Sequence, residues 1–141
     1  MIPYGRQSFS DMVTNNFRAG KRVSLFKDIY YTPMLVKPLV DAVHELVQKK
    51  AKGIFNVVGD GRISKYDFGL KLAKEFNLDN SLIDEGKIIN RSFLANCPHD
   101  MSLSNEKATN FLGRKMGGLD QHILKLKAQE VSGIAKELQT L

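Results

Sequence analysis

The sequence has few residues that could build a disulfide or a metal site. Its only cysteine is Cys97, and its three histidines, His44, His99 and His122, are scattered along the chain. A single cysteine excludes an intrachain disulfide and is typical of a protein from a reducing compartment. One cysteine with scattered histidines also lacks the spacing of a zinc site. We therefore predict no structural metal.

Long apolar runs are also missing. The chain has no stretch of about 18 apolar residues, which is the length that a membrane-spanning helix needs. Its first residues lack the apolar stretch of a secretory signal. These two features predict a cytoplasmic protein with no membrane segment.

The charge alone does not define a partner. The 141 residues carry a formal charge of +6, with 43% hydrophobic and 26% charged residues, which is ordinary for one globular domain or part of a larger one. A positive charge suits an anionic ligand such as a nucleotide phosphate, but scattered lysines also simply keep a protein soluble. Basic residues alternate with acidic ones, and no aromatic and basic motif of an RNA-binding module appears. We therefore predict no nucleic-acid partner.

The strongest local pattern lies between Gly53 and Phe76. The apolar run from Ile54 to Val58 predicts a strand buried on both faces of an α/β sheet. Gly59, Asp60 and Gly61 should end it in a turn. Ser64, with Asp67 three residues later, predicts a helix that begins at Lys65. An apolar stripe on that helix, made of Phe68, Leu72, Ala73 and Phe76, should cover the sheet.

Further helices are predicted along the chain. A short helix over 8–18, capped by Ser8 or Ser10, carries Phe9, Met12, Val13 and Phe17 on one side and should close at Gly20. A second helix follows Pro33 and either starts near Lys37 or is kinked at Pro38. Its apolar stripe is Val36, Leu39, Val40, Val43, Leu46 and Val47. Ser104 or Asn105 should cap a short helix that ends at Gly113, and 119–141 is helical with a slip of phase near Gly133.

Shorter strands complete the expected fold. The stretch from Arg22 to Phe26 alternates and predicts a strand, and 87–89 predicts a brief one. The Tyr30-Tyr31 pair would either line a ligand site or bridge the core and the surface with wet hydroxyl groups. We interpret His44, on the second helix, as a surface residue.

Three stretches in this order resemble a known family: FKDIYYTPMLV at 26–36, GIFNVVGDGRISKYDF at 53–68 and PHDMSLSNEKATNFLG at 98–113. They are similar to the carboxy-terminal portion of extended short-chain dehydrogenases, most closely to dTDP-4-dehydrorhamnose reductases and related nucleotide-sugar reductases. The resemblance covers Tyr4 to about Leu126. It implies a small mixed α/β substrate-binding domain with short strands and four to six helices, over 1–118, with 119–141 as its helical segment or tail.

The catalytic and cofactor motifs of that family are missing from this chain. No GxxGxxG motif is present, because Gly59-Asp60-Gly61 lacks a third glycine. No tyrosine is followed four residues later by lysine: Tyr4, Tyr30, Tyr31 and Tyr66 are followed at that distance by Ser8, Met34, Leu35 and Leu70. The resemblance therefore implies that NADP or NAD serves the complete enzyme and is not bound by this chain alone. A separate Rossmann domain would supply it, and a homo-oligomer is left open.

The resemblance also implies a substrate site that faces the Rossmann domain. The expected contributors are the start of the chain (Tyr4 and Arg6), the first helix (Phe9 and Met12), the turn at 28–33 (Asp28 and Thr32) and Arg62. Arginine suits a diphosphate because its planar fork binds phosphate oxygens in pairs, although a free arginine is also well solvated. Arg62 follows the carboxyl end of the expected strand, where ligands gather in open α/β sheets.

One departure from the family concerns the third stretch. Many members carry an arginine directly before the proline, and this chain has Cys97 before Pro98. A diphosphate contact from this loop is therefore in doubt. We interpret His99 as an exposed loop histidine and Asp100 as a brace for the segment 103–113.

Two functions remain open from the sequence. The first is the substrate-binding part of a nucleotide-sugar reductase, acting on a 4-keto-6-deoxy sugar nucleotide for deoxysugar and surface polysaccharide synthesis, without hydride transfer by this chain alone. The second is a non-catalytic protein-binding domain, because one branch of the family, the regulatory subunit of methionine adenosyltransferase, acts by binding another protein.

Overall fold

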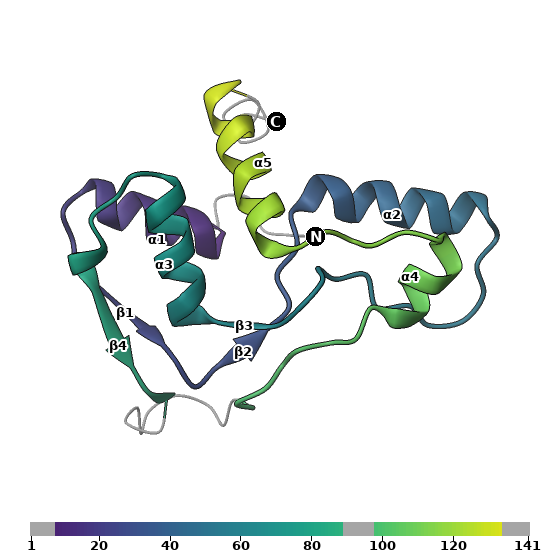
Figure 1. Ribbon diagram of the computed structural model, residues 1–141, viewed down its shortest axis with the longest axis horizontal. Helices are drawn as coiled ribbons and strands as arrows, with labels where there is room; N and C mark the ends of the chain where they lie inside the picture. The colour runs from purple at the N-terminus through teal and green to yellow at the C-terminus, as the bar shows by residue number, and fades with distance from the viewer. Residues whose placement is uncertain (1–7, 89–97, 134–141) are drawn as a thin grey trace.

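A computed structural model of the chain describes residues 8–88 and 98–133, and it consists of two regions, each with its own core. Figure 1 shows one region on the left and the other on the right. The elements in chain order are α1 Phe9–Arg18, β1 Val23–Phe26, β2 Tyr30–Tyr31, α2 Val36–Gln48, β3 Ile63–Ser64, α3 Lys65–Glu75, the short 3-10 helix η1 Asn80–Leu82, β4 Ile83–Gly86, α4 Glu106–Leu112 and α5 Leu119–Val131. The predicted small mixed α/β fold with short strands is confirmed.

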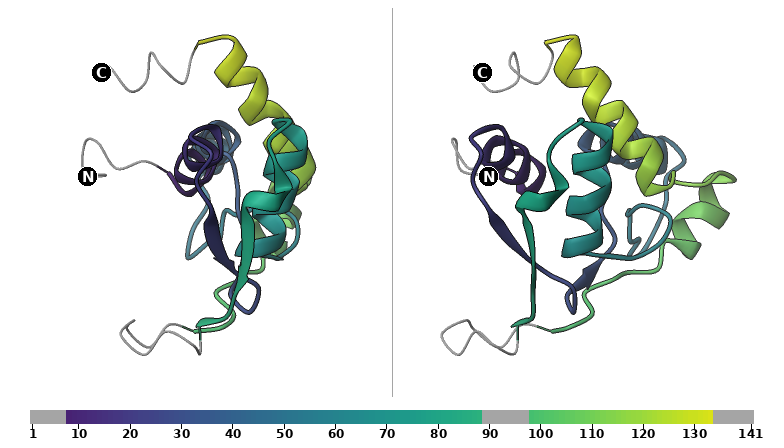
Figure 2. Two further views of the ribbon diagram at one scale, coloured as in Figure 1. Left: turned by 90° about the vertical axis from the view of Figure 1, so that its left-hand side faces the viewer. Right: turned by 60° about the vertical axis from the view of Figure 1, so that its left-hand side comes forward.

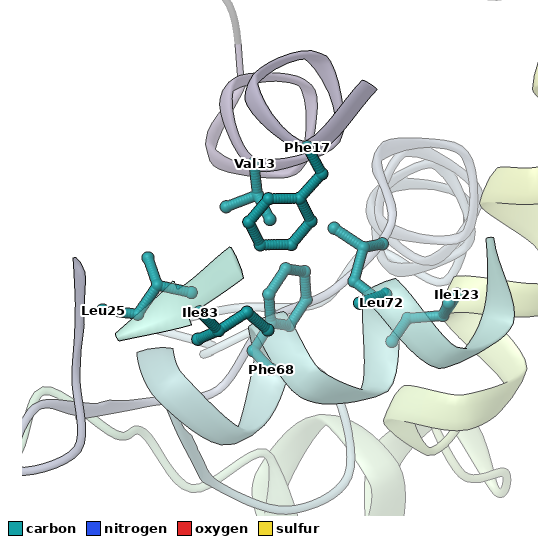
Figure 3. Close-up of a cluster of buried hydrophobic side chains, with 8 residues drawn as sticks. Val13, Phe17, Leu25, Phe68, Leu72, Ile83 and Ile123 are labelled. Carbon is teal, nitrogen blue, oxygen red and sulfur yellow. The ribbon is translucent and has the colours of Figure 1, made fainter. Parts of the chain in front are cut away.

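The first region is built from α1, α3, α5 and a parallel pair of strands. β1 pairs with β4 from Val23 opposite Ile83 to Phe26 opposite Gly86. Helices α1 and α3 contact each other and the strands, and α5 runs along α3 (Figure 2). Figure 3 shows side chains of α1 pointing toward those of α3, with strand side chains beside them. This first core consists of Val13, Phe17, Leu25, Phe68, Leu72, Ala73, Ile83 and Ile123.

Two serine caps fix where α1 and α3 begin. Ser8 Oγ accepts a hydrogen bond from the Asp11 amide at 3.1 Å, and the Asp11 carboxylate accepts from the Ser8 amide at 3.1 Å. Ser64 Oγ likewise accepts from the Asp67 amide at 3.0 Å. Each cap satisfies amides that the first turn of a helix leaves without partners. The predicted starts of both helices are confirmed.

The second region is smaller and combines α2, α4 and the segment 54–58. α2 contacts α4, and the two lie side by side in the right half of Figure 1. The buried residues are Ala42, Leu46, Ala108, Leu112 and Met116, with Phe55 and Val57 packed against them. α2 begins at Val36, so Pro38 lies in its first turn, where the missing N–H removes no helical hydrogen bond. Of the two alternatives, the start near Lys37 is therefore the one observed.

The predicted strand from Ile54 to Val58 is wrong. These residues form no strand, and Ile54 is 86% exposed. Two of its backbone carbonyls accept hydrogen bonds from side chains at the start of α4. Lys107 Nζ donates to the Ile54 carbonyl at 2.9 Å, and Asn105 Nδ2 donates to the Val58 carbonyl at 3.0 Å. Among the described residues no strand runs beside this segment, so its strand-forming composition finds no partner.

The ends of the remaining elements differ in part from the predictions. The strand expected at 22–26 is β1. The one expected at 87–89 is wrong for residues 87 and 88, which follow the end of β4 at Gly86, and residue 89 lies outside the described residues. α4 ends at Gly113, whose φ of +69° is the left-handed conformation expected for a glycine stop. α5 ends at Val131, before Gly133, and the predicted continuation beyond it lies outside the described residues.

α5 is joined to the first region by side chains as well as by Ile123. Arg18 on α1 donates twice to the Glu130 carboxylate on α5, at 2.6 and 2.8 Å, and Lys71 on α3 pairs with Asp120 at 2.6 Å. The boundary expected at residue 118 stays a prediction. Within the described ranges, no helix combines the length and the hydropathy that a membrane crossing requires.

Candidate functional site

The candidate site is organised by β2 and the segment that follows Pro98. β2 pairs with β3 on one side, with Tyr30 opposite Ser64. On its other side the Tyr30 amide donates to the His99 carbonyl at 2.8 Å, and the Met101 amide donates to the Tyr30 carbonyl at 2.9 Å. Residues 99–101 thus lie along β2 and bring a distant part of the chain next to the turn at 28–33.

Three of the predicted site residues contact this segment. His99 Nδ1 lies 3.1 Å from the Asp28 carbonyl and 3.7 Å from the Asp28 carboxylate. Thr32 Oγ1 accepts a hydrogen bond from the Leu103 amide at 3.2 Å. Arg62 forms an ion pair with Asp100. Asp28, Thr32 and Arg62 therefore gather around residues 99–103, and we call this group the β2 cluster.

Arg62 is the arginine of the β2 cluster. Its guanidinium carbon lies 4.3 Å from the centre of the Tyr30 ring, and its side chain is 53% exposed. The ring attracts the cation, and the contact with Asp100 uses only part of its five donors. The arrangement can therefore present free N–H groups to an anion such as a phosphate.

The other polar groups of the β2 cluster are held by local hydrogen bonds. Hydrogen bonds from Ser102, and then the charge of Arg62, lower the pKa of Asp100. The Asp28 carboxylate accepts from the Ile88 amide at 3.1 and 3.2 Å. Asp100 therefore braces its own loop rather than the segment 103–113 as predicted. His99 is exposed as predicted, but it also contacts Asp28.

The remaining predicted site residues are placed elsewhere. Tyr4, Arg6 and Cys97 lie outside the described residues. Phe9 and Met12 pack against the first core, where the Phe9 ring lies 5.6 Å from that of Phe68. The roles of these residues in a site stay predictions.

The two adjacent tyrosines have different environments. Tyr30 lies beneath Arg62 in the β2 cluster. The Tyr31 ring packs near Phe9 and Phe68, and its hydroxyl is buried with no hydrogen-bond partner among the described residues. Burial raises the pKa of that hydroxyl. The alternative in which the tyrosine hydroxyls are wet is therefore wrong for Tyr31.

Asp60 is a junction that the sequence analysis treated only as part of a turn. Its carboxylate accepts hydrogen bonds from Asn105 Nδ2 at 2.7 Å, the Gly117 amide at 2.9 Å and the Met116 amide at 3.2 Å. Burial acts to raise the pKa of Asp60, but these hydrogen bonds outweigh it and hold the pKa below its usual value. Asp60 thus fastens the end of the segment 54–58 to the starts of α4 and α5.

Close backbone packing surrounds Asp60. A Cβ on Gly59 would lie 2.3 Å from the Pro33 carbonyl oxygen. Nearby, the His122 ring is buried beside Gly117, and neither of its nitrogens has a well-formed hydrogen bond to a described residue. Burial is the main cause that lowers the pKa of His122. In the sequence, the triplet Gly59-Asp60-Gly61 indicated only a turn. The residues that bind the Asp60 carboxylate, Asn105, Met116 and Gly117, lie far from it along the chain.

The described part of the chain shows no metal centre. Within 8–88 and 98–133, no three Asp, Glu, His or Cys side chains lie close enough to hold a metal ion. An open hollow of about 510 Å³ lies between the start of α2 and the end of α5, and none of the predicted site residues lines it. The β2 cluster therefore remains the better candidate on chemical grounds.

Known proteins place the fold and the family. The family model for the RmlD substrate binding domain matches residues 3–128. The structure of dTDP-4-dehydrorhamnose reductase from Bacillus anthracis in complex with NADP matches with a TM-score of 0.80 at 14% identity, over 88% of this chain and 44% of that one. A hypothetical dTDP-4-dehydrorhamnose reductase from Sulfolobus tokodaii matches with a TM-score of 0.69 at 32% identity, over 82% and 41%.

A third reductase, from Clostridium acetobutylicum, matches with a TM-score of 0.73 at 18% identity, over 87% of this chain and 45% of its own. None of the curated proteins matches the chain significantly. The chain thus spans less than half the length of the reductases that it matches. The match of the family model over most of the sequence shows that this chain belongs to the RmlD substrate binding domain family.

Proposed function

We propose that this chain is the substrate-binding part of an NAD(P)-dependent nucleotide-sugar reductase similar to dTDP-4-dehydrorhamnose reductase. The observation that carries the proposal is the match of residues 3–128 to a substrate binding domain. The substrate would be a 4-keto-6-deoxy sugar attached to a nucleoside diphosphate, and the product would serve deoxysugar and surface polysaccharide synthesis.

The nicotinamide cofactor is assigned to a separate cofactor-binding domain. The residues of this chain do not fit the cofactor, because the sequence contains neither GxxGxxG nor a tyrosine with lysine four residues later. The chain would bind and orient the sugar nucleotide, and it would not reduce it alone.

The β2 cluster supplies groups suited to this ligand. Arg62 would bind the diphosphate, because its exposed fork retains donors and lies over the Tyr30 ring. Thr32, Asp28 and His99 carry hydroxyl, carboxylate and imidazole groups that suit the hydroxyls of a sugar. Tyr4, Arg6, Phe9 and Met12 are proposed as further contacts.

Calorimetric titration of the chain with a dTDP-sugar tests this proposal. We expect binding by the wild-type chain and about 10-fold weaker binding by Arg62→Ala, because one charge-assisted contact to phosphate is worth roughly 1.4 kcal/mol. Arg22→Ala is the matched control, since Arg22 is also an exposed arginine paired with an aspartate, Asp84, but lies in the first region.

Two results would count against this assignment. Equal losses of affinity for the Arg62 and Arg22 variants would remove the diphosphate role of Arg62. A wild-type chain that binds no sugar nucleotide, yet binds another protein, would favour the non-catalytic protein-binding role instead.

A further inference from the structure

His122 is a buried ionisable group that the proposed function does not use. It lies in the first turn of α5 and is 5% exposed, and neither ring nitrogen has a well-formed hydrogen bond to a described residue. Burying a polar group without partners costs free energy, and burying a charged one costs much more. The protonated ring would bring both a charge and a second N–H donor into this place. The buried position therefore favours the neutral ring.

The charged groups around His122 do not offset its burial. Burial is the largest influence on the pKa of His122, and it lowers that pKa. The neighbouring backbone and Asp60 act to raise the pKa, whereas Lys125, three residues later on α5, acts to lower it. From α3, Lys71 pairs with Asp120 at 2.6 Å, so this carboxylate is already engaged. The net direction is downward, which leaves the ring uncharged near pH 7.

The His122 ring packs against Gly117, which is part of the junction at Asp60. A Cβ on Gly117 would lie 3.2 Å from Cε1 and 3.3 Å from Nε2 of the ring, so the two residues are in close contact. Gly117 binds Asp60 twice: its amide donates to the Asp60 carboxylate at 2.9 Å, and its carbonyl accepts from the Asp60 amide at 2.9 Å. On this side, water reaches Nε2 only if the ring and Gly117 separate.

We propose that His122 is a pH-sensitive switch that keeps the start of α5 packed against the Asp60 junction while its ring is neutral and releases it when the ring gains a proton. In the released state the protonated ring is hydrated and Gly117 has separated from Asp60. Arg18 still holds the far end of α5 through Glu130, so the opening is local rather than a global unfolding.

The pH dependence of this opening has a fixed direction. The pKa of His122 is lowered in the closed state and returns to about 6.5 when the ring is exposed. The closed state therefore has its full stability above pH 6.5 and loses it as the pH falls from there through the closed-state pKa. Within that window the open state binds one more proton, so the opening equilibrium constant rises up to about 10-fold for each pH unit.

The first experiment is an NMR titration of the histidine rings in the wild-type chain. We expect His122 to titrate below pH 6.5, because burial disfavours the protonated ring. Its signals are identified by their absence from the spectrum of His122→Leu, in which an apolar side chain replaces the ring.

The second experiment measures amide hydrogen exchange between pH 7 and pH 5, corrected for the intrinsic pH dependence of exchange. We expect the Gly117 and His122 amides to open up to about 10-fold more for each pH unit lost, and always more readily than the Leu72 amide of α3, which reports global unfolding. In His122→Leu this pH dependence should disappear. His44→Gln is the control, because His44 is exposed on α2, and it should behave like the wild-type chain.

Three outcomes would overturn the proposal. These are titration of His122 at or above pH 6.5, opening at Gly117 that depends on pH equally in the wild-type chain and in His122→Leu, and a Gly117 amide as well protected as that of Leu72. If His122→Leu does not fold, His122→Gln replaces it, since its side chain is polar but cannot gain a proton in this range. The wild-type titration decides the first point with either variant.

Discussion

The two regions of the molecule differ in how completely they bury their apolar residues. The first region encloses eight core residues between helices α1, α3 and α5 and the paired strands. The second buries five, of which two are alanines, and it leaves four valines of α2 and Ile54 exposed. The first region therefore has a closed core, whereas the second leaves an apolar surface open to solvent. The difference predicts that the first region contributes more to the stability of the fold.

The largest expected effects test which core dominates stability. Leu72→Ala should reduce the free energy of unfolding by about 3 to 5 kcal/mol, because Leu72 is fully buried between helices of the first region. Leu46→Ala in the second region should cost about 2 kcal/mol, because a loosely enclosed site relaxes more easily. Urea unfolding followed by circular dichroism measures both. Equal losses of unfolding free energy for the two variants would contradict the claim that the first core contributes more to stability than the second.

The next effect tests the junction between the regions. Gly59→Ala should destabilise the chain by about 1 to 3 kcal/mol, because the added Cβ would lie 2.3 Å from the Pro33 carbonyl oxygen. Gly118→Ala is the control, since no atom lies within 4 Å of its Cβ position and its φ is −77°. Thermal unfolding of the two variants gives the comparison. If the Gly59→Ala protein is as stable as the control, the backbone around Gly59 and Pro33 can shift at little cost in free energy.

Asp60 should give a smaller effect that depends on pH. Asp60→Ala removes the acceptor of three hydrogen bonds and should cost about 1 to 3 kcal/mol near neutral pH. The folded-state pKa of Asp60 is lowered, so its contribution is complete above the unfolded value of about 3.9 and is lost as the pH falls through the folded value. In Asp60→Asn that part of the acid dependence should disappear.

Urea unfolding from pH 2 to pH 7 checks the Asp60 prediction. The other carboxylates with lowered pKa values, such as Glu130 and Asp84, will keep a residual slope in the Asp60→Asn variant. An acid dependence identical to that of the wild-type chain would mean that Asp60 does not fasten the junction in solution.

Local signals predicted most of the first region. Ser8 and Ser64 cap helices because a hydroxyl meets an amide three residues away, which is an interaction encoded within one turn. The apolar stripe of α3 covers strands as expected, although these are β1 and β4 rather than the segment 54–58, and it also contacts α1.

The predictions failed where a structure depends on contacts between residues that are far apart in the sequence. The segment 54–58 has the composition of a strand, but a strand exists only beside another strand, and none of the described ones is its neighbour. Asp60 is fixed by Asn105 and Gly117, which no local pattern connects to it. Each of these residues depends on contacts that a single sequence does not encode by spacing.

The candidate site was reached through the family resemblance rather than through spacing. Asp28, Thr32 and Arg62 were implied by it, and the structure brings them to one segment because β2 accepts residues 99–101 alongside Tyr30. His99 was interpreted as a plain surface residue, since nothing in its neighbourhood in the sequence indicates that it lies beside Asp28.

The most direct measurement of the central claim is cofactor oxidation with a dTDP-4-keto-6-deoxy sugar, followed for the chain alone, for a separately produced cofactor-binding domain alone and for their mixture. The account predicts oxidation of NADPH or NADH only in the mixture, because this chain supplies the substrate site and not the cofactor site. Oxidation by the chain alone, or a mixture in which the two parts bind each other and the sugar nucleotide yet never oxidise either cofactor, would contradict it.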